Sequence, residues 1–153
     1  MRAEPLTRLH CISCGAEPDA RDPYPFRCPH ADGGDGREHL LVSEPDMTRA
    51  RFALGTSPQP FVRHRELLHS YWRARRLGLS DAAYVDMVEE LDARVAAVEG
   101  HGFAATPLAP NTALAQAVRM PEGEVWVKNE TGNVSGSHKA RHLFALALHL
   151  GLG

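Results

Sequence analysis

The stretch from residue 123 to residue 150 constrains the fold most, because an apolar run, a polar loop rich in Gly and Ser, and a second apolar run follow one another. The first run, Gly123 to Lys128, predicts a buried strand. The last run, His142 to Leu150, is apolar almost all round and predicts a helix that is covered on most of its sides. Strand, loop and helix in this order are typical of an α/β fold.

A unit of this kind needs a further parallel strand and more helices to bury its apolar surfaces. The chain has 153 residues and stops directly after the second apolar run. We therefore expect it to be the N-terminal fragment of a longer protein.

Lys139 lies where the polar loop meets the expected helix, and it is the candidate for the chemistry. An amine at a helix N-terminus faces the positive end of the helix dipole, and partial burial adds a desolvation cost. Both effects favour the neutral form of the amine, which is the form that attacks carbonyl groups. A Schiff base with an aldehyde cofactor is the natural use of such a lysine.

The segment from Glu130 to His142 resembles the signature of the fold-type II pyridoxal-phosphate enzymes, which include threonine synthase, serine/threonine dehydratase, cysteine synthase and the tryptophan synthase β chain. That signature contains an acidic residue, a spacer, small residues, an aromatic residue, a lysine and an arginine. Two positions depart from it, because His138 replaces the aromatic residue and His142 replaces a Gly or Ala. The matching positions are Glu130, Ser135, Ser137, Lys139, Ala140 and Arg141.

The resemblance implies an incomplete three-layer α/β fold of the tryptophan synthase β type, with Thr106-Pro-Leu108 near its beginning and a short helix from Leu114 to Val118. It implies a pyridoxal-phosphate-dependent lyase that acts on an amino acid by β/γ-elimination or replacement, inactive as this fragment alone and homodimeric as the parent protein. Lys139 would hold the cofactor and move the proton at the substrate's α carbon. Donors near a helix N-terminus suit anions. The expected cofactor contacts are Ser137 and His138, and the expected substrate contacts are Ser135, Asn133 and Thr131.

A second group of residues predicts a metal site near the N-terminus. Cys11 and Cys14 form a C-x2-C pair, Cys28 follows at a distance typical of a zinc ribbon, and the fourth ligand is His30 or His39. We expect Cys11, Cys14, Cys28 and His30 to hold a structural zinc ion in a closed site, with His39 as the alternative to His30. A similar Cys-rich ribbon occurs in some threonine synthase-like enzymes.

The pattern of Cys, Pro and Gly divides the chain into three parts. Residues 1–45 form the zinc-ribbon-like segment, with a short strand near Glu38–Val42. Residues 46–62 form a linker, and residues 63–153 form the first part of the catalytic domain. That part begins with helices at about 64–77 and 81–99.

The composition excludes several classes of protein. With 17 basic and 19 acidic side chains the net charge is −2, so the broad positive field that nucleic acids require is missing. No run approaches the ~20 apolar residues of a membrane span, and the N-terminus lacks a secretory signal, so we expect a cytoplasmic protein. The alternative function is a non-enzymatic zinc-ribbon module that binds a protein partner.

Overall fold

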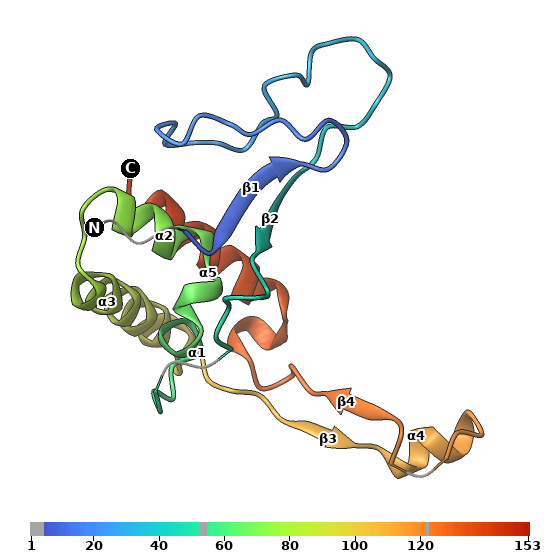
Figure 1. The fold of residues 1–153 in the computed structure, drawn as a ribbon. Coiled ribbons are helices and arrows are strands. Elements are labelled where there is room, and N and C mark those ends of the chain that lie inside the picture. The colour runs from blue at the N-terminus through green and yellow to red at the C-terminus, as the bar shows by residue number, and fades with distance from the viewer. Residues whose placement is uncertain (1–4, 53–54, 122) are drawn as a thin grey trace.

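The computed structural model describes residues 5–52, 55–121 and 123–153. It is a mixed α and β structure with two small sheets (Figure 1). In chain order the elements are β1 (Thr7–Cys11), β2 (Leu41–Pro45), α1 (Pro60–Arg63), the 3-10 turn η1 (Arg65–Leu67), α2 (His69–Arg76), α3 (Asp81–Glu99), β3 (Leu108–Pro110), α4 (Thr112–Ala117), β4 (Trp126–Lys128), the 3-10 turn η2 (Val134–Gly136) and α5 (Lys139–Leu150).

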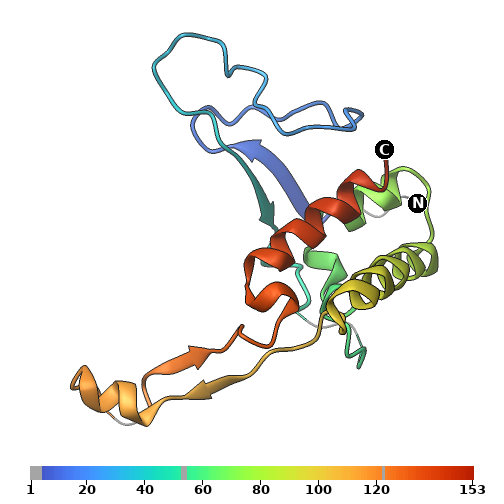
Figure 2. The ribbon, with the colours of Figure 1, turned by 180° about the vertical axis from the view of Figure 1, so that it is seen from behind.

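Helices α1, α2, α3 and α5 form a central body, and two arms leave it (Figures 1 and 2). The β1–β2 ribbon with its long loop lies at the top of both views, and the arm of β3, α4 and β4 lies at the bottom. The core lies in the body, where Phe61, Phe103 and Phe144 pack with ring centroids 4.6 to 5.3 Å apart. Its other members are Leu6, Val62, Tyr71, Trp72, Ala74, Tyr84, Val88, Val134, Ala140 and Leu148.

Both sheets are antiparallel pairs of strands. In the first sheet Thr7 lies opposite Pro45 and Cys11 opposite Leu41, so the strand expected at 38–42 is present but begins three residues later. In the second sheet Leu108 lies opposite Lys128. The expected mixed α and β composition is confirmed, whereas the described residues form neither a parallel sheet nor a three-layer arrangement.

The buried strand expected at 123–128 is shorter and more exposed than predicted. Only Trp126–Lys128 are in β4, and the Trp126 side chain is exposed. The reason is that β4 pairs only with β3, whose three residues are themselves exposed, and the arm projects away from the helices. The helix expected near Leu114 is present as α4.

The single helix expected at 64–77 is divided into α1, η1 and α2. Leu68 is extended, with φ −96° and ψ 130°, and separates η1 from α2. Side-chain donors occupy carbonyl groups that a continuous helix would need: the Arg65 guanidinium donates to the Val62 carbonyl at 2.8 Å, and Trp72 Nε1 donates to the Glu66 carbonyl at 2.7 Å. Helix α1 also begins inside the linker expected at 46–62, because the Gln59 side chain caps it.

Helix α3 matches the prediction of a helix at 81–99. The Ser80 hydroxyl accepts a hydrogen bond from the Ala83 N–H, and Gly100 ends the helix with φ 84°. Tyr84 and Val88 are fully buried. The end of the expected apolar stripe is different, because Val98 is 87% exposed and packs against nothing in the core.

Helix α5 buries one side and exposes another. Phe144 and Leu148 are buried, but Leu143 is 61% exposed, so the expectation of a helix covered on most sides is wrong for this structure. Helices α2 and α3 pack against α5, and neither covers Leu143. Within the described residues, no helix combines the length and the apolar character that crossing a membrane requires.

Removal of the Phe144 ring should lower the free energy of unfolding strongly. We expect Phe144→Ala to cost about 3–5 kcal/mol, because it leaves a cavity between two other phenylalanines. The neighbouring change Leu143→Ala, on the exposed side of α5, should cost less than about 0.5 kcal/mol. Urea unfolding of both variants measures the difference, and equal costs would contradict this packing.

Candidate functional site

The first candidate site lies where β1 ends and turns back. Cys11 is the last residue of β1, and the Gly15 N–H donates to the Cys11 carbonyl at 2.8 Å. Gly15 has φ 73°, a conformation that costs glycine little and other residues more. This tight turn brings Cys14 back beside Cys11, as a C-x2-C metal ligand pair requires.

Three thiols and one imidazole meet at this turn. The ligand atoms of Cys11, Cys14, Cys28 and His39 all lie within 4.8 Å of one another. Cys14 Sγ is 3.6 Å from Cys28 Sγ, and His39 Nδ1 is 3.6 Å from Cys11 Sγ and 3.4 Å from Cys28 Sγ. A tetrahedron with metal–sulfur bonds of about 2.3 Å has edges of about 3.8 Å. The group could therefore hold a metal ion.

The histidine of this group is His39, not His30. His39 precedes β2, and the pairing of β2 with β1 carries it to the end of β1, where Cys11 lies. His30 is exposed, and its backbone N–H donates to Cys28 Sγ at 3.4 Å. The prediction of His30 as the fourth ligand is therefore wrong, and the alternative ligand, His39, lies beside the thiols.

Asp35 fixes the orientation of the His39 ring. Its Oδ1 lies 3.2 Å from His39 Nε2, while Nδ1 of the same ring faces the thiols. This contact and the contacts with Cys14 and Cys11 raise the pKa of His39 to about 9. A carboxylate on the distal nitrogen is the usual partner of a metal-binding histidine, because it sets which nitrogen is free to coordinate.

The two buried thiols differ in their pKa. Burial raises the pKa of Cys11, but hydrogen bonds from the backbone N–H groups of Cys14 and Ser13 outweigh this effect and lower it to about 6. Burial raises the pKa of Cys28 to about 11. A bound metal ion favours the thiolate form of each cysteine and the neutral form of the histidine, so binding would release protons from the site.

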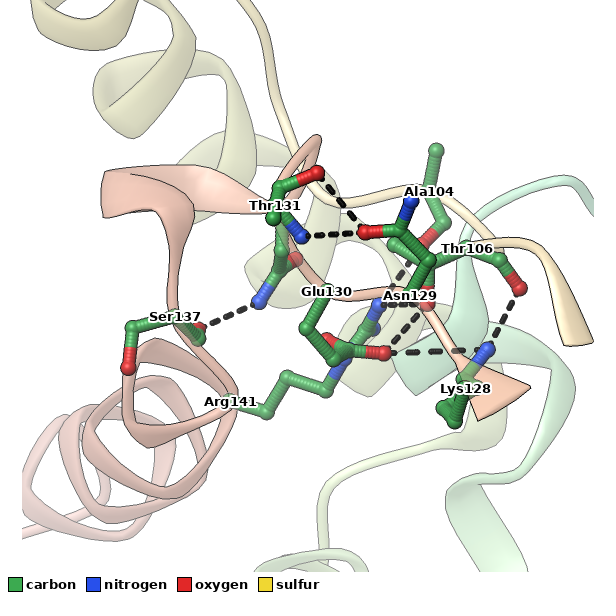
Figure 3. A network of polar contacts seen from close by, with 9 residues as sticks. Ala104, Thr106, Lys128, Asn129, Glu130, Thr131, Ser137 and Arg141 are labelled. Carbon is green, nitrogen blue, oxygen red and sulfur yellow. Dashed lines mark hydrogen bonds and ion pairs between the residues drawn. The ribbon is translucent and has the colours of Figure 1, made fainter. Parts of the chain in front are cut away.

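The second candidate site is the loop between β4 and α5. Its centre is Glu130, which accepts hydrogen bonds from the Thr106 hydroxyl and from Arg141 Nε, the latter at 3.0 Å (Figure 3). Lys128 Nζ lies 3.6 Å from Glu130 Oε1 and donates to the Thr106 carbonyl. Arg141 Nη2 also donates to the Ala104 carbonyl at 3.0 Å. The network joins the end of β4, the segment before β3 and the first turn of α5.

The polar network lowers the pKa of Glu130. The Thr106 hydroxyl contributes most to this shift, and the Arg141 guanidinium contributes next. Both groups favour the ionised carboxylate. Glu130 therefore stays charged, and it holds Arg141 in place.

Lys139 is the first residue of α5 and is exposed. The partial desolvation expected for this lysine is therefore not seen in this structure. Within the described residues its ε-amino group makes no hydrogen bond or ion pair, whereas its backbone N–H donates to the Ser137 hydroxyl at 3.2 Å. His138, the preceding residue, is also exposed.

The expected substrate contacts have different environments. Asn133 is buried, and its Nδ2 donates to the Ser137 carbonyl at 2.7 Å. Ser135 has a positive φ of 49°, and its N–H donates to Glu99 Oε2 at 3.2 Å. Thr131 is exposed and donates to Asn129 Oδ1 at 2.7 Å through its hydroxyl. All three lie on the same loop as Lys139, but each is already engaged with another group of the chain.

The sequence analysis missed Asp35 and the contact of Thr106 with Glu130. Asp35 stands four residues before His39, a short spacing that could have identified it as the partner of a metal-binding histidine. Thr106 is 24 residues from Glu130, and no local signal connects the two. Comparison of the chain with protein-family models, with curated proteins and with solved structures found no match in any of the three.

Replacement of Glu130 should change stability in a pH-dependent way. We expect Glu130→Gln to lower the free energy of unfolding at pH 7 by about 1 kcal/mol, because it weakens charged hydrogen bonds at a partly exposed position. A lowered pKa in the folded protein means that this stabilisation is complete above the usual pKa of 4.5 and is lost as the pH falls through the folded value. Urea unfolding of both proteins should show a difference that shrinks as the pH is lowered.

The matched control is Glu124→Gln, an exposed glutamate on the same arm. It should leave stability unchanged at every pH. A constant difference between Glu130→Gln and the unchanged chain, from neutral to acid pH, would contradict the role of the charge.

Proposed function

We propose that Lys139 is the cofactor lysine of a pyridoxal-phosphate-dependent lyase that acts on an amino acid, similar to the threonine synthase-like enzymes that residues 130–142 resemble. One observation carries the proposal: the Lys139 amine lies at the start of α5, exposed and without a partner among the described residues. An aldehyde needs an amine that it can reach and that no other group of the chain holds.

The contrast with the other lysine supports this assignment. The chain contains two lysines, Lys128 and Lys139. The amine of Lys128 is engaged by Glu130 and by the Thr106 carbonyl. Lys139 is thus the more available of the two for an aldehyde.

The loop around Lys139 supports the binding of an anionic substrate. This loop contacts one carboxylate of the chain itself, because the Ser135 N–H donates to Glu99 Oε2. A substrate carboxylate has the same chemistry and would replace Glu99 there. Ser137 and His138 are the neighbours of Lys139 that would contact the cofactor, with Asn133 and Thr131 as further substrate contacts.

The cofactor and the residues of the chain would have different roles in the reaction. Pyridoxal phosphate, when bound, supplies an electron sink for the amino acid's α carbon. The Lys139 amine would hold the cofactor and would take and return the proton at that carbon. The ion pair between Glu130 and Arg141 would keep the helix start, and with it the lysine, in position.

We further infer that the metal held by Cys11, Cys14, Cys28 and His39 is a structural zinc ion. Three thiolates and one imidazole in a tetrahedron are a preferred zinc donor set. Four protein ligands leave no open position for a substrate, so the ion would stabilise the β1–β2 ribbon and its loop rather than take part in the reaction.

Zinc binding should depend on His39 and not on His30. We expect one zinc ion per chain, with His39→Ala lowering the affinity by at least about 100-fold and Asp35→Asn by about 10–100-fold. His30→Ala is the matched control and should bind zinc as tightly as the unchanged chain. Competition with a coloured chelator measures all four proteins, and equal losses in the two histidine variants would overturn this ligand set.

Pyridoxal phosphate should react with Lys139 in preference to Lys128. We expect borohydride reduction of the mixture to fix the cofactor on Lys139, as read by peptide mass spectrometry. The visible absorbance band should persist in Lys128→Ala and be lost in Lys139→Ala. Half-saturation should occur at a concentration at least about tenfold below that for acetyl-lysine amide, because a binding site adds affinity that a free amine lacks.

The rival function predicts a different result. A non-enzymatic zinc-ribbon interaction module is favoured by the apolar groove of about 560 Å³ between α3 and α5, where Val98 and Leu143 are exposed. In that case Lys139 would react no better than acetyl-lysine amide, and the proposed lyase function would fall while the zinc site would stand.

A further inference from the structure

A second cavity lies between the N-terminal ribbon and helix α2. Its volume is about 220 Å³. One wall is β1, through Thr7 and Arg8, and another is α2, through His69, Arg73 and Arg76. Residues 17–20 of the loop after β1 also line it, together with Pro5, Leu9 and Pro25. The cavity is remote in sequence from the Lys139 loop and does not include any of the thiols.

Three residues that line the cavity each carry a buried side-chain polar atom without a hydrogen-bond partner within the described residues. These atoms are Thr7 Oγ1, His69 Nδ1 and Arg73 Nε. Thr7 is only 3% exposed and Arg73 only 6% exposed. A buried donor or acceptor without a partner is unfavourable, so a polar ligand that reached these atoms would stabilise the folded chain.

The charges around the cavity indicate the sign of that occupant. Glu17 is paired with Arg8 at 2.7 Å, and Asp19 is paired with Arg21 at 3.1 Å, so both acidic groups are neutralised. Arg73 donates to one backbone carbonyl, that of Asp22, at 2.8 Å.

Neither guanidinium on the α2 wall has a carboxylate partner. Within the described residues Arg73 makes no ion pair, and Arg76 makes neither an ion pair nor a hydrogen bond. The excess charge at the cavity is therefore positive and comes from α2.

We propose that this cavity binds a small oxyanion, a carboxylate or a phosphate, between β1 and α2. Guanidinium groups present paired N–H donors that match the oxygens of these anions, and a hydroxyl adds a further donor. The cavity volume of about 220 Å³ accommodates an anion of this size. The site is independent of the proposed lyase function.

An anion at this position would connect the N-terminal ribbon with helix α2. It would accept from Thr7 on the ribbon and from Arg73 and Arg76 on α2. The ribbon and its loop carry the three thiols and His39. Occupancy of the cavity would therefore strengthen the attachment of the proposed zinc-binding segment to the helical body.

The test uses the full chain loaded with zinc. Inorganic phosphate and, separately, acetate are titrated at constant ionic strength set with chloride, and binding is followed by calorimetry and by the NMR signal of the Arg73 Nε–H group. We expect saturable binding of at least one of the two anions with a shift of the Arg73 signal. Thr7→Val and Arg76→Gln should each weaken binding by at least about tenfold.

The matched control is Arg75→Gln, on the same helix but outside the cavity, where the Arg75 guanidinium donates to the Leu79 carbonyl. It should bind the anion as the unchanged chain does. Stronger binding of phosphate than of acetate, or the reverse, identifies which oxyanion the site prefers.

Three results would overturn the proposal. One is equal binding of chloride, which would show only general attraction to positive charge. Another is equal weakening by Arg75→Gln and Arg76→Gln. The third is a combination of two observations: the NMR signal of the Arg73 Nε–H group does not shift on addition of either anion, and Thr7→Val is as stable as the unchanged chain. Together they would mean that the cavity holds only water.

Discussion

The contact of three phenylalanine rings holds together segments that lie far apart in the sequence. Phe61 belongs to α1, Phe103 follows α3, and Phe144 belongs to α5, and the rings meet edge to face or tilted. Because α5 begins at Lys139 and is anchored by Phe144, the same contact sets where the lysine lies. The arm of β3, α4 and β4 leaves from this cluster as well, since Phe103 directly precedes it.

The Glu130 network complements this apolar contact. It ties the end of β4 to the start of α5 and to Thr106, so both ends of the loop that carries Lys139 are fixed. The loop between them uses two residues with positive φ, Ser135 and Gly136, and the buried Asn133 amide to hold its shape. The lysine is thus placed by groups that do not bond to its side chain.

Local signals in the sequence were sufficient for α3 but not for α2. Helix α3 has its own cap at Ser80, its own stop at Gly100 and a regular apolar side, all of which are readable within a few residues. The break before α2 depends on Trp72 and Arg65 donating to carbonyl groups of the preceding turn, which a periodic pattern does not show. Likewise, the choice of His39 over His30 depends on the pairing of β1 with β2, and the exposure of Trp126 depends on what lies beside the arm.

In both candidate sites a carboxylate contacts one nitrogen-containing side chain and leaves a nearby nitrogen without a carboxylate partner. Asp35 holds one nitrogen of His39, so the other faces the thiols. Glu130 holds Arg141, two residues after Lys139 on the first turn of α5. Each residue of an α-helix turns by about 100°, so residues two apart point about 160° away from each other. Because Arg141 is held toward the arm, Lys139 is directed away from it, and Glu130 makes no ion pair with the Lys139 amine.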